Sequence, residues 1–176
     1  ERTLFLQQLS RYYRDLQRQS AIILIGGDLN AKLGQRIDPR SLQERKIVGR
    51  HAKGTVNEAG RELREFLHAH RLLAANTCFK HPLHKRVTWV GQTANTKRAN
   101  QIDYILIPHT LRKLLDDAYS ILTFNHSSDH YPVLTRINVS KYYQARRPKI
   151  FPPSYDYSLF YEGTWDPHLQ QMVYTE

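Results

Sequence analysis

Apolar residues follow two different spacings along the first 140 positions of the chain. Helical spacing, with charged residues on the opposite face, predicts a helix to about residue 19 through Leu4, Phe5, Leu9, Tyr12 and Leu16. It also predicts helices through Leu63, Phe66, Leu67 and His70, after the suitable N-cap Asn57, and through Leu111, Leu114, Leu115 and Ala118. Short apolar runs predict strands at residues 22–25, 72–79, 87–90, 102–107 and 133–139.

The strand at residues 22–25 is followed by Gly26, Gly27, Asp28 and, two positions later, Asn30. Paired glycines at the end of a buried strand indicate a place where the backbone approaches another group closely. If the chain stays extended here, Asp28 and Asn30 point to the same side and present a carboxylate beside a carboxamide. Such a pair can hold a water molecule or a metal ion together with a phosphoryl oxygen. A polar turn that caps the strand is the alternative interpretation.

Two polar segments are predicted to be connections between these elements. Residues 31–57 contain three glycines, one proline and mixed charges with little periodicity, which indicates a long surface connection. Residues 92–101 form a second polar connector, which carries Lys97, Arg98 and Asn100.

The cysteine and histidine residues give no strong metal or redox signal. Cys78 is the only cysteine, so it cannot form an internal disulfide, which fits a reducing compartment. Its apolar context predicts a core position and not a nucleophile. His70 lies on the apolar face of a predicted helix, which is more typical of a structural histidine than of a ligand. His81 and His84 would suit a metal ion, but no third ligand stands nearby and Pro82 marks a loop, so a loop is favoured.

Asp103 stands inside the apolar strand predicted at residues 102–107. A carboxylate in such a place is costly unless it is paired or hydrogen-bonded, so Asp103 requires a partner. The sequence Ser128-Asp129-His130 supplies one, because a buried carboxylate commonly orients a histidine and fixes its tautomer. Taken alone, the same three residues are typical of an ordinary turn.

The chain is strongly basic. It has 26 Lys and Arg residues against 16 Asp and Glu residues, a formal net charge of +10 at pH 7. This excess favours a polyanionic partner, nucleic acid first and an anionic membrane surface second, and solvated surface charge is the alternative interpretation. No apolar run approaches the length of a membrane span, and the first residues lack the apolar region of a signal peptide.

The composition changes near residue 141. A basic run at Lys141, Arg146, Arg147 and Lys149 precedes an aromatic and proline-rich segment that extends to residue 176. We therefore predict one domain over residues 1–140 and a linker with an extended tail over residues 141–176; docking of the tail onto a neighbouring domain is the alternative. The chain begins with Glu1 and enters a helical pattern almost at once, so we expect it to be a piece of a longer protein.

Three motifs follow one another in a recognisable order: Gly-Asp-Leu-Asn at 27–30, Gln-Ile-Asp-Tyr-Ile-Leu at 101–106 and Ser-Asp-His at 128–130. Over residues 1–140 the chain resembles the endonuclease/exonuclease/phosphatase superfamily (deoxyribonuclease I-like), whose last three motifs have this order beside strands. Asn-Thr-Cys-Phe at 76–79 and Thr-Trp at 88–89 make it similar to the endonuclease domains of non-LTR retrotransposons and to craniofacial development protein 2-like proteins.

The resemblance implies an α/β fold, a four-layer α/β sandwich in which two packed mixed sheets are flanked by helices. The superfamily's first half carries an Asn motif, a metal-binding Glu and an active-site Tyr, and none of these is identifiable here. We therefore expect the C-terminal half to two-thirds of the domain. Without the partner sheet, the strands at Ile22, Ile102 and Val133 are expected to expose their inner faces.

The resemblance also implies a role for each motif residue. Asp28 would orient or deprotonate the attacking water, and Asn30 would hold that water and the scissile phosphate. Asp129, together with Asp28, would bind Mg²⁺ or Mn²⁺. His130 would help to neutralise the phosphoryl oxygens, held in place by Asp103. These parts suit phosphodiester hydrolysis, which needs an activated water and neutralised phosphoryl charge.

Substrate contacts are implied at Trp89, Arg98, Asn100 and Ser128, with DNA as the partner. The expected activity is divalent-metal-dependent nicking of DNA by a retrotransposon-type endonuclease, weak or absent in this part alone. Further expected partners are the missing N-terminal half or a downstream reverse transcriptase domain, with no membrane partner and an intracellular, nuclear location. The alternatives are a nuclease-dead remnant that binds nucleic acid or protein, and a phosphomonoesterase of the same superfamily.

Overall fold

The computed structural model describes residues 2–19, 22–38, 40–93, 96–122 and 127–140. All of them belong to the first of two units into which the chain divides, Glu1–Lys141 and Tyr142–Glu176. The predictions for the basic run and the aromatic tail at residues 141–176 lie outside the described residues and stay predictions.

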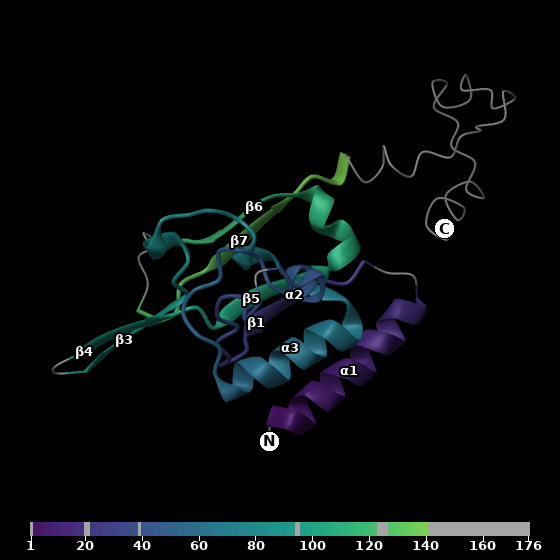
Figure 1. Cartoon of the computed structure of the whole chain (residues 1–176), viewed down its shortest axis with the longest axis horizontal. Coiled ribbons are helices and arrows are strands. Elements are labelled where there is room, and N and C mark those ends of the chain that lie inside the picture. Colours follow the sequence, from purple (N-terminus) through teal and green to yellow (C-terminus); the bar gives the residue numbers. More distant parts are fainter. Residues whose placement is uncertain (1, 20–21, 39, 94–95, 123–126, 141–176) are drawn as a thin grey trace, which may run out of the picture. The chain divides into compact units, whose positions relative to one another are not determined.

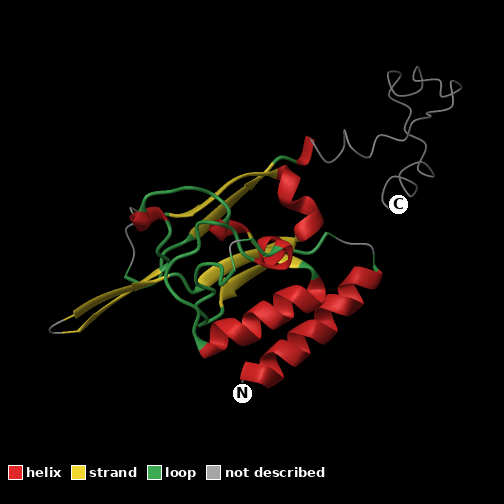
Figure 2. Ribbon diagram, in the orientation of Figure 1, coloured by secondary structure: helices red, strands yellow, loops and turns green. Residues whose placement is uncertain are grey.

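The first unit is a mixed α/β structure (Figures 1 and 2). Its α-helices are α1 (Arg2–Arg18), α2 (Leu42–Ile47) and α3 (Glu58–His70). Its strands are β1 (Ile25–Asp28), β2 (Leu72–Ala74), β3 (Trp89–Thr93), β4 (Thr96–Asn100), β5 (Asp103–Pro108), β6 (Leu115–Ser120) and β7 (Val133–Ile137). Short 3₁₀ helices are η1 (Ala75–Thr77), η2 (Leu83–Lys85) and η3 (His109–Leu114).

The central sheet has the strand order β1-β5-β2, and both of its pairings are antiparallel. Figure 1 shows α1 and α3 side by side next to this sheet, and the β3–β4 hairpin reaching away from it. β6 and β7 form a separate antiparallel pair, and β7 packs against β5 and η1. The prediction of an α/β fold is confirmed at this level.

The main core lies between the helices and the central sheet. Tyr104 and Leu106 point into it from β5, because alternate residues of a strand face the same side. Leu63 and Leu67 reach it from α3, whose predicted N-cap is confirmed: the Asn57 side chain accepts a hydrogen bond from the backbone N–H of Gly60.

His70 behaves as the structural histidine that its position predicts. Its ring packs against Tyr13 and Phe66, and its Nε2 lies 2.9 Å from the Ser10 hydroxyl oxygen. Burial, helped by the charge of Arg14, lowers the pKa of His70, so the neutral ring is favoured in the core.

The predicted apolar face of α1 is wrong. Tyr13 is buried and Leu6 and Leu9 pack on the core, whereas the other predicted residues are exposed: Leu4, Phe5, Tyr12 and Leu16. Apolar side chains cover more than one face of this helix, so their spacing alone does not determine which face is buried. Packing against α3 selects the face through Leu6, Leu9 and Tyr13 and leaves apolar surface uncovered by described residues.

The first strand lies later than predicted. Pairing of Ile25 with Leu106 and of Asp28 with Asp103 fixes β1 at residues 25–28, so both glycines lie inside the strand. A Cβ atom at Gly27 would meet nothing within 4 Å, so no described residue makes the predicted close approach there. Of the inner-face residues expected to be exposed, Ile22 is exposed, while Val133 is half-buried and Ile102 is buried.

Three further predictions need correction. The predicted helix through residues 111–118 is η3 followed by β6, because the pairing of β6 with β7, distant in sequence, outweighs the local helical spacing. The predicted strand at residues 72–79 ends at Ala74, where the Thr77 hydroxyl donates to the Ala74 carbonyl and favours a turn. The connector at 92–101 contains β4, which closes a hairpin with β3.

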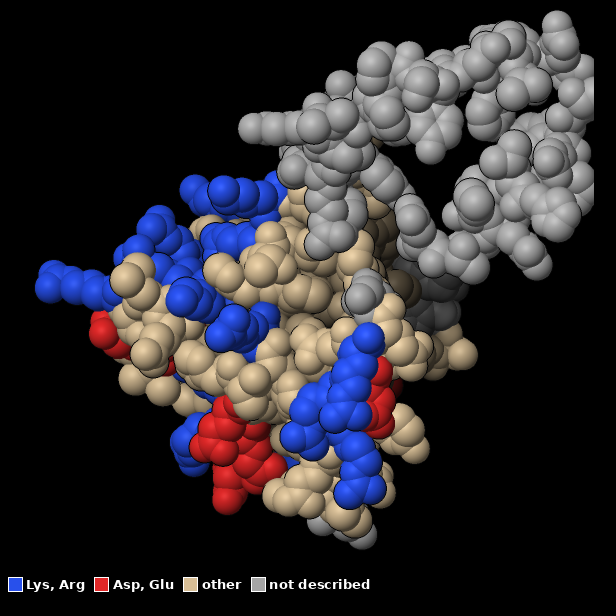
Figure 3. Space-filling model, turned by 90° about the vertical axis from the view of Figure 1, so that its right-hand side faces the viewer, with Lys and Arg blue, Asp and Glu red and all other residues tan. Residues whose placement is uncertain are grey.

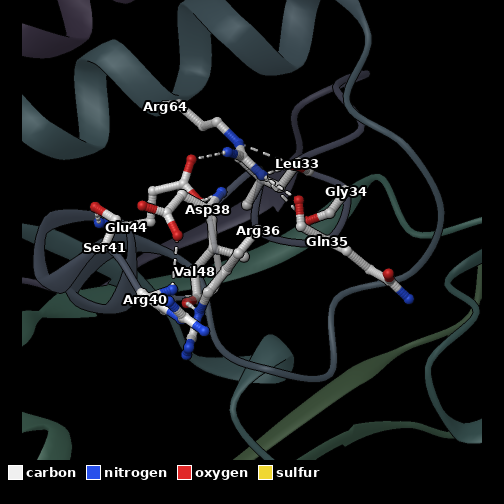
Figure 4. Close-up of polar contacts among 10 residues, drawn as sticks. All are labelled: Leu33, Gly34, Gln35, Arg36, Asp38, Arg40, Ser41, Glu44, Val48 and Arg64. Atoms are coloured by element: carbon white, nitrogen blue, oxygen red, sulfur yellow. Dashed lines mark hydrogen bonds and ion pairs between the residues drawn. The ribbon is translucent and has the colours of Figure 1, made fainter.

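Residues 31–57 are not a surface connection. They contain α2, and five of them are buried apolar residues: Ala31, Leu33, Ile47, Val48 and Ala52. A buried loop needs donors for its carbonyl groups, and the guanidinium of Arg64 supplies them (Figure 4). It donates to the carbonyls of Leu33, at 2.6 and 3.0 Å, and Gln35, at 2.7 Å, and to the Glu44 carboxylate at 2.8 Å.

The remaining cysteine and histidine predictions concern loops. His81 lies 2.6 Å from the Asp117 carboxylate, and neither His81 nor His84 joins a group of potential metal ligands among the described residues. Cys78 is half-buried, and burial raises the pKa of its thiol, which opposes a nucleophilic role. In the described part of the chain, no helix is long and apolar enough to cross a membrane.

Replacing Arg64 with Met is expected to destabilise the protein by about 3–5 kcal/mol, because it removes the ion-pair partner of the largely buried Glu44 carboxylate and leaves several loop carbonyls without their donor. Urea unfolding of the two proteins measures this difference. Arg18→Ala is the matched control, since it breaks the exposed pair with Asp15 and should cost at most about 0.5 kcal/mol. Equal losses in both variants would contradict the role given to Arg64.

Candidate active site

Two carboxylates face each other across the β1–β5 ladder. The register places Asp28, at the end of β1, directly opposite Asp103, at the start of β5. Directly opposed residues point to the same face of a sheet, and like charges in that position repel. The Asp28 side chain is about one-third exposed and that of Asp103 less so. The pairing therefore holds two negative charges close together, where a bound cation would offset their repulsion.

His130 lies between the two carboxylates. Its Nδ1 lies 3.1 Å from Oδ1 of Asp103, and its Nε2 lies 3.9 Å from Oδ2 of Asp28. The first distance is that of a hydrogen bond and the second is too long for one. Asp103 therefore orients the ring, and the predicted partnership of Asp103 with His130 is confirmed.

Three ligand atoms converge at this point, one each from Asp28, Asp103 and His130, and all lie within 4.8 Å of one another. Two carboxylate oxygens and one imidazole nitrogen suit a small divalent cation that keeps several of its waters. The same groups can also accept or donate a proton. An open cavity of about 530 Å³ adjoins them and is lined in part by Asp103, His130 and Val133.

Asn30 is positioned differently from the prediction. The Asn30 backbone N–H donates to Oδ1 of Asp28 at 2.8 Å, and Asn30 has a left-handed φ of 45°. The chain therefore turns after β1 instead of staying extended, and the two-residue alternation that was to place Asp28 and Asn30 on one face does not apply. The structure shows the polar turn that was the alternative interpretation of this segment.

Asp129 lies outside the group of three ligands. Its carboxylate accepts a hydrogen bond of 2.7 Å from the indole N–H of Trp89. The ring of Trp89 lies over Gly91, where a Cβ atom would come within 2.2 Å of the ring. Trp89 is thus held from two sides next to the site, and a glycine two positions after an aromatic residue was the sequence signal for this arrangement.

The structure places the other predicted substrate contacts on the hairpin and on the loop before β7. Arg98 is exposed on β4, paired with Gly91, and Asn100 is half-buried opposite Trp89. The Ser128 hydroxyl accepts a hydrogen bond of 3.0 Å from the backbone N–H of His130, so Ser128 shapes the turn that carries the histidine.

Two buried polar residues position the site and were given no role from the sequence. The hydroxyl oxygen of Thr88 accepts hydrogen bonds of 3.0 Å from the backbone N–H groups of Ile102 and Asp103. The side-chain amide of Asn76 donates to the Asp103 carbonyl at 3.0 Å. Both residues lie inside apolar runs, where a polar side chain needs a structural partner, and that was the available signal.

No family model matches the chain. It is similar to craniofacial development protein 2. Two such proteins, from Tragulus javanicus and Bos taurus, are each 32% identical to it over 138 residues, which is 75% of this chain. The chain spans less than a quarter of their length, 23% and 22%. The similarity to craniofacial development protein 2 suggests an endonuclease/exonuclease/phosphatase-like family.

Replacing Thr88 with Val keeps the shape of the buried side chain but leaves two backbone N–H groups without an acceptor. We expect a loss of about 1–3 kcal/mol in stability and faster amide hydrogen exchange at Ile102 and Asp103. Thr88→Ser keeps the hydroxyl and serves as the control. Unchanged exchange at these two amides in Thr88→Val would show that Thr88 does not anchor the start of β5.

Proposed function

We propose that this chain is part of an endonuclease/exonuclease/phosphatase-type domain that hydrolyses phosphodiester bonds and nicks DNA in a reaction that depends on Mg²⁺ or Mn²⁺. The observation that carries the proposal is His130 set between Asp28 and Asp103 on paired strands. An oriented imidazole beside two carboxylates offers the charge neutralisation and proton transfer that phosphoryl transfer needs.

Each residue has a role in this proposal. Asp28 and Asp103 would hold the cation with His130 beside them, and a bound ion would supply Lewis-acid stabilisation of phosphoryl charge. Asp28, the more exposed carboxylate, orients the attacking water. His130 contacts the phosphoryl oxygens, with its ring fixed by Asp103. Asp129, which accepts a hydrogen bond from Trp89 and lies outside the group of three ligands, is not a ligand in this proposal.

DNA is the proposed substrate because of charge and of exposed groups beside the site. The net charge of +10 favours a polyanion. Arg98 on the hairpin and Ser128 on the turn before His130 are exposed, where backbone phosphates can reach them, while Trp89 and Asn100 lie half-buried on the same hairpin as Arg98.

The finer architecture is also a proposal: these residues form the C-terminal part of a four-layer α/β sandwich. Supporting it, Phe5, Tyr12 and Leu16 on α1 and Leu24 before β1 are exposed large apolar side chains. Such a surface is costly in water, and further chain packed on it would remove that cost. The tests below therefore use the complete natural protein that contains this sequence.

Binding of Mn²⁺, followed by electron paramagnetic resonance, tests the cation site without any reaction. Asp28→Asn and Asp103→Asn should each weaken Mn²⁺ binding by at least about tenfold, because each removes a charged ligand. Asp129→Asn distinguishes the two candidate sets of ligands. A small effect on Mn²⁺ binding favours Asp28, Asp103 and His130. A loss as large as that of Asp28→Asn favours Asp129 with Asp28, as predicted from the sequence. Undiminished binding in all three variants would exclude a cation at this site.

Nicking of supercoiled plasmid, with Mg²⁺ and with EDTA, tests the activity. His130→Ala is expected to lower the nicking rate by at least about 100-fold while DNA binding stays nearly unchanged, because the ring acts on the reacting phosphate. Arg18→Gln is the control on a remote helix. Retained nicking in His130→Ala would refute the role of His130, and turnover of inositol phosphates without nicking would favour a phosphomonoesterase.

A further inference from the structure

Three arginines from separate parts of the chain bind the backbone of one segment, residues 45–51. The guanidinium of Arg112 donates to the Arg45 carbonyl at 3.2 Å, that of Arg36 to the Val48 carbonyl at 3.0 Å, and that of Arg86 to the His51 carbonyl at 3.1 Å. The three acceptors are spaced three residues apart. The guanidinium groups are thus arranged in a row along this segment.

These contacts fix the arginines without neutralising them, because a carbonyl carries no net charge. Within the described residues, no ion pair joins Arg36, Arg50, Arg86 or Arg112 to a carboxylate. Arg64 and Arg18 differ, since each is paired with an acid. Arg86 also has a buried Nε with no hydrogen-bond partner among the described atoms. Fixed, uncompensated cations of this kind are prepared for an anionic ligand.

Further positive side chains extend the row. Burial and the charges of Arg45, Arg50 and Arg112 lower the pKa of Arg36. Burial and the charges of Arg86 and Lys80, among others, lower the pKa of His51, and Lys46 acts on His109 in the same way. Lys and Arg side chains gather in the upper left part of the face in Figure 3, with few acidic side chains among them. The basic band comprises Arg36, Lys46, Arg50, Lys80, Arg86 and Arg112.

The band lies apart from the candidate active site. Val48 forms a bridge to Ala74 of β2, so the segment that carries the band extends the sheet beyond β2, on the side away from β1. Val48 is therefore three interstrand distances away from β1, or about 14 Å. Asp103 is the first residue of the six-residue strand β5, and Arg112 follows the last residue of the same strand. The length of the strand therefore separates Arg112 from Asp103 by a distance on the order of 20 Å.

The band also leads back toward the site. Lys53 follows two residues after His51, and its backbone N–H donates to the Gln101 side chain at 3.0 Å, two residues before Asp103. Lys53 is half-buried, and burial together with the charges of Lys32 and Arg86 lowers its pKa. A long, regularly charged polymer can therefore contact the band and the site at once, which a small anion cannot.

We propose that the basic band is a second DNA-binding surface, which holds the phosphate backbone of a duplex outside the reacting site. The choice of DNA as the polyanion rests on the proposed nuclease function. Recognition here is independent of base sequence, because guanidinium groups arranged on a backbone meet phosphates and not base edges. The band would retain the duplex while the site acts on one bond.

Fluorescence anisotropy of a labelled duplex, measured in EDTA so that no cleavage occurs, tests the band separately from catalysis. In the complete protein, the triple variant Arg36→Gln, Arg86→Gln and Arg112→Gln is expected to bind about 10–100 times more weakly at 0.15 M salt. The slope of log affinity against log salt should fall by about 2.7, because each lost phosphate contact contributes about 0.9.

Two further triple variants complete the experiment. Lys46→Gln, Arg50→Gln and Lys80→Gln removes exposed charges, so it keeps the fold intact and should weaken binding similarly. Arg11→Gln, Arg14→Gln and Arg18→Gln removes the same charge from α1 and should have little effect. Equal weakening by the α1 variant would show that net charge alone acts, and unchanged binding by both band variants would also overturn the proposal.

The nuclease and the band can fail independently. DNA binding that depends on the band, without nicking by the wild type, would contradict the proposed nuclease function and support the band as a DNA-binding surface. Nicking that depends on His130, with no contribution of the band to DNA binding, would support the nuclease function and contradict the proposal for the band.

Discussion

The antiparallel pairing of β1 with β5 is the constraint on which the candidate site depends. Its register sets Asp28 opposite Asp103, and a shift by one residue would turn every side chain of β1 to the other face. The pairing places two like charges together, which is unfavourable by itself. His130 lies against both carboxylates, and a cation held by the three groups would offset their repulsion.

Buried polar side chains hold the segments around this pairing. Arg64 supplies donors to the loop that follows β1, so that loop packs in the core instead of covering the surface. Thr88 and Asn76 bind the backbone at the start of β5 and thereby fix the position of Asp103. Rigid backbone on both sides of the carboxylates is what keeps a repulsive pair in place.

Charge is distributed in two distinct regions of the described structure. Carboxylates and one histidine converge at the end of β1, whereas arginines held by neutral carbonyls line the segment beyond β2. The proposed chemistry would use both regions, because an acidic centre attracts cations and a basic surface attracts polyanions. The two regions are joined through the sheet itself.

Local spacing in the sequence predicted the helix after Asn57 and the strand containing Asp103, and the cost of an unpaired carboxylate predicted the partnership of Asp103 with His130. The α/β class was implied by the family resemblance of the motifs. The sequence alone could not select the buried face of α1, the position of β1, the strand character of residues 115–120, or the burial of residues 31–52. Those depend on partners distant in sequence: α3, β5, β7 and Arg64. Only the tertiary structure separated Asp129 from the three ligands and arranged Arg36, Arg86 and Arg112 along one segment, because contacts between remote residues leave no periodic signal in a single chain.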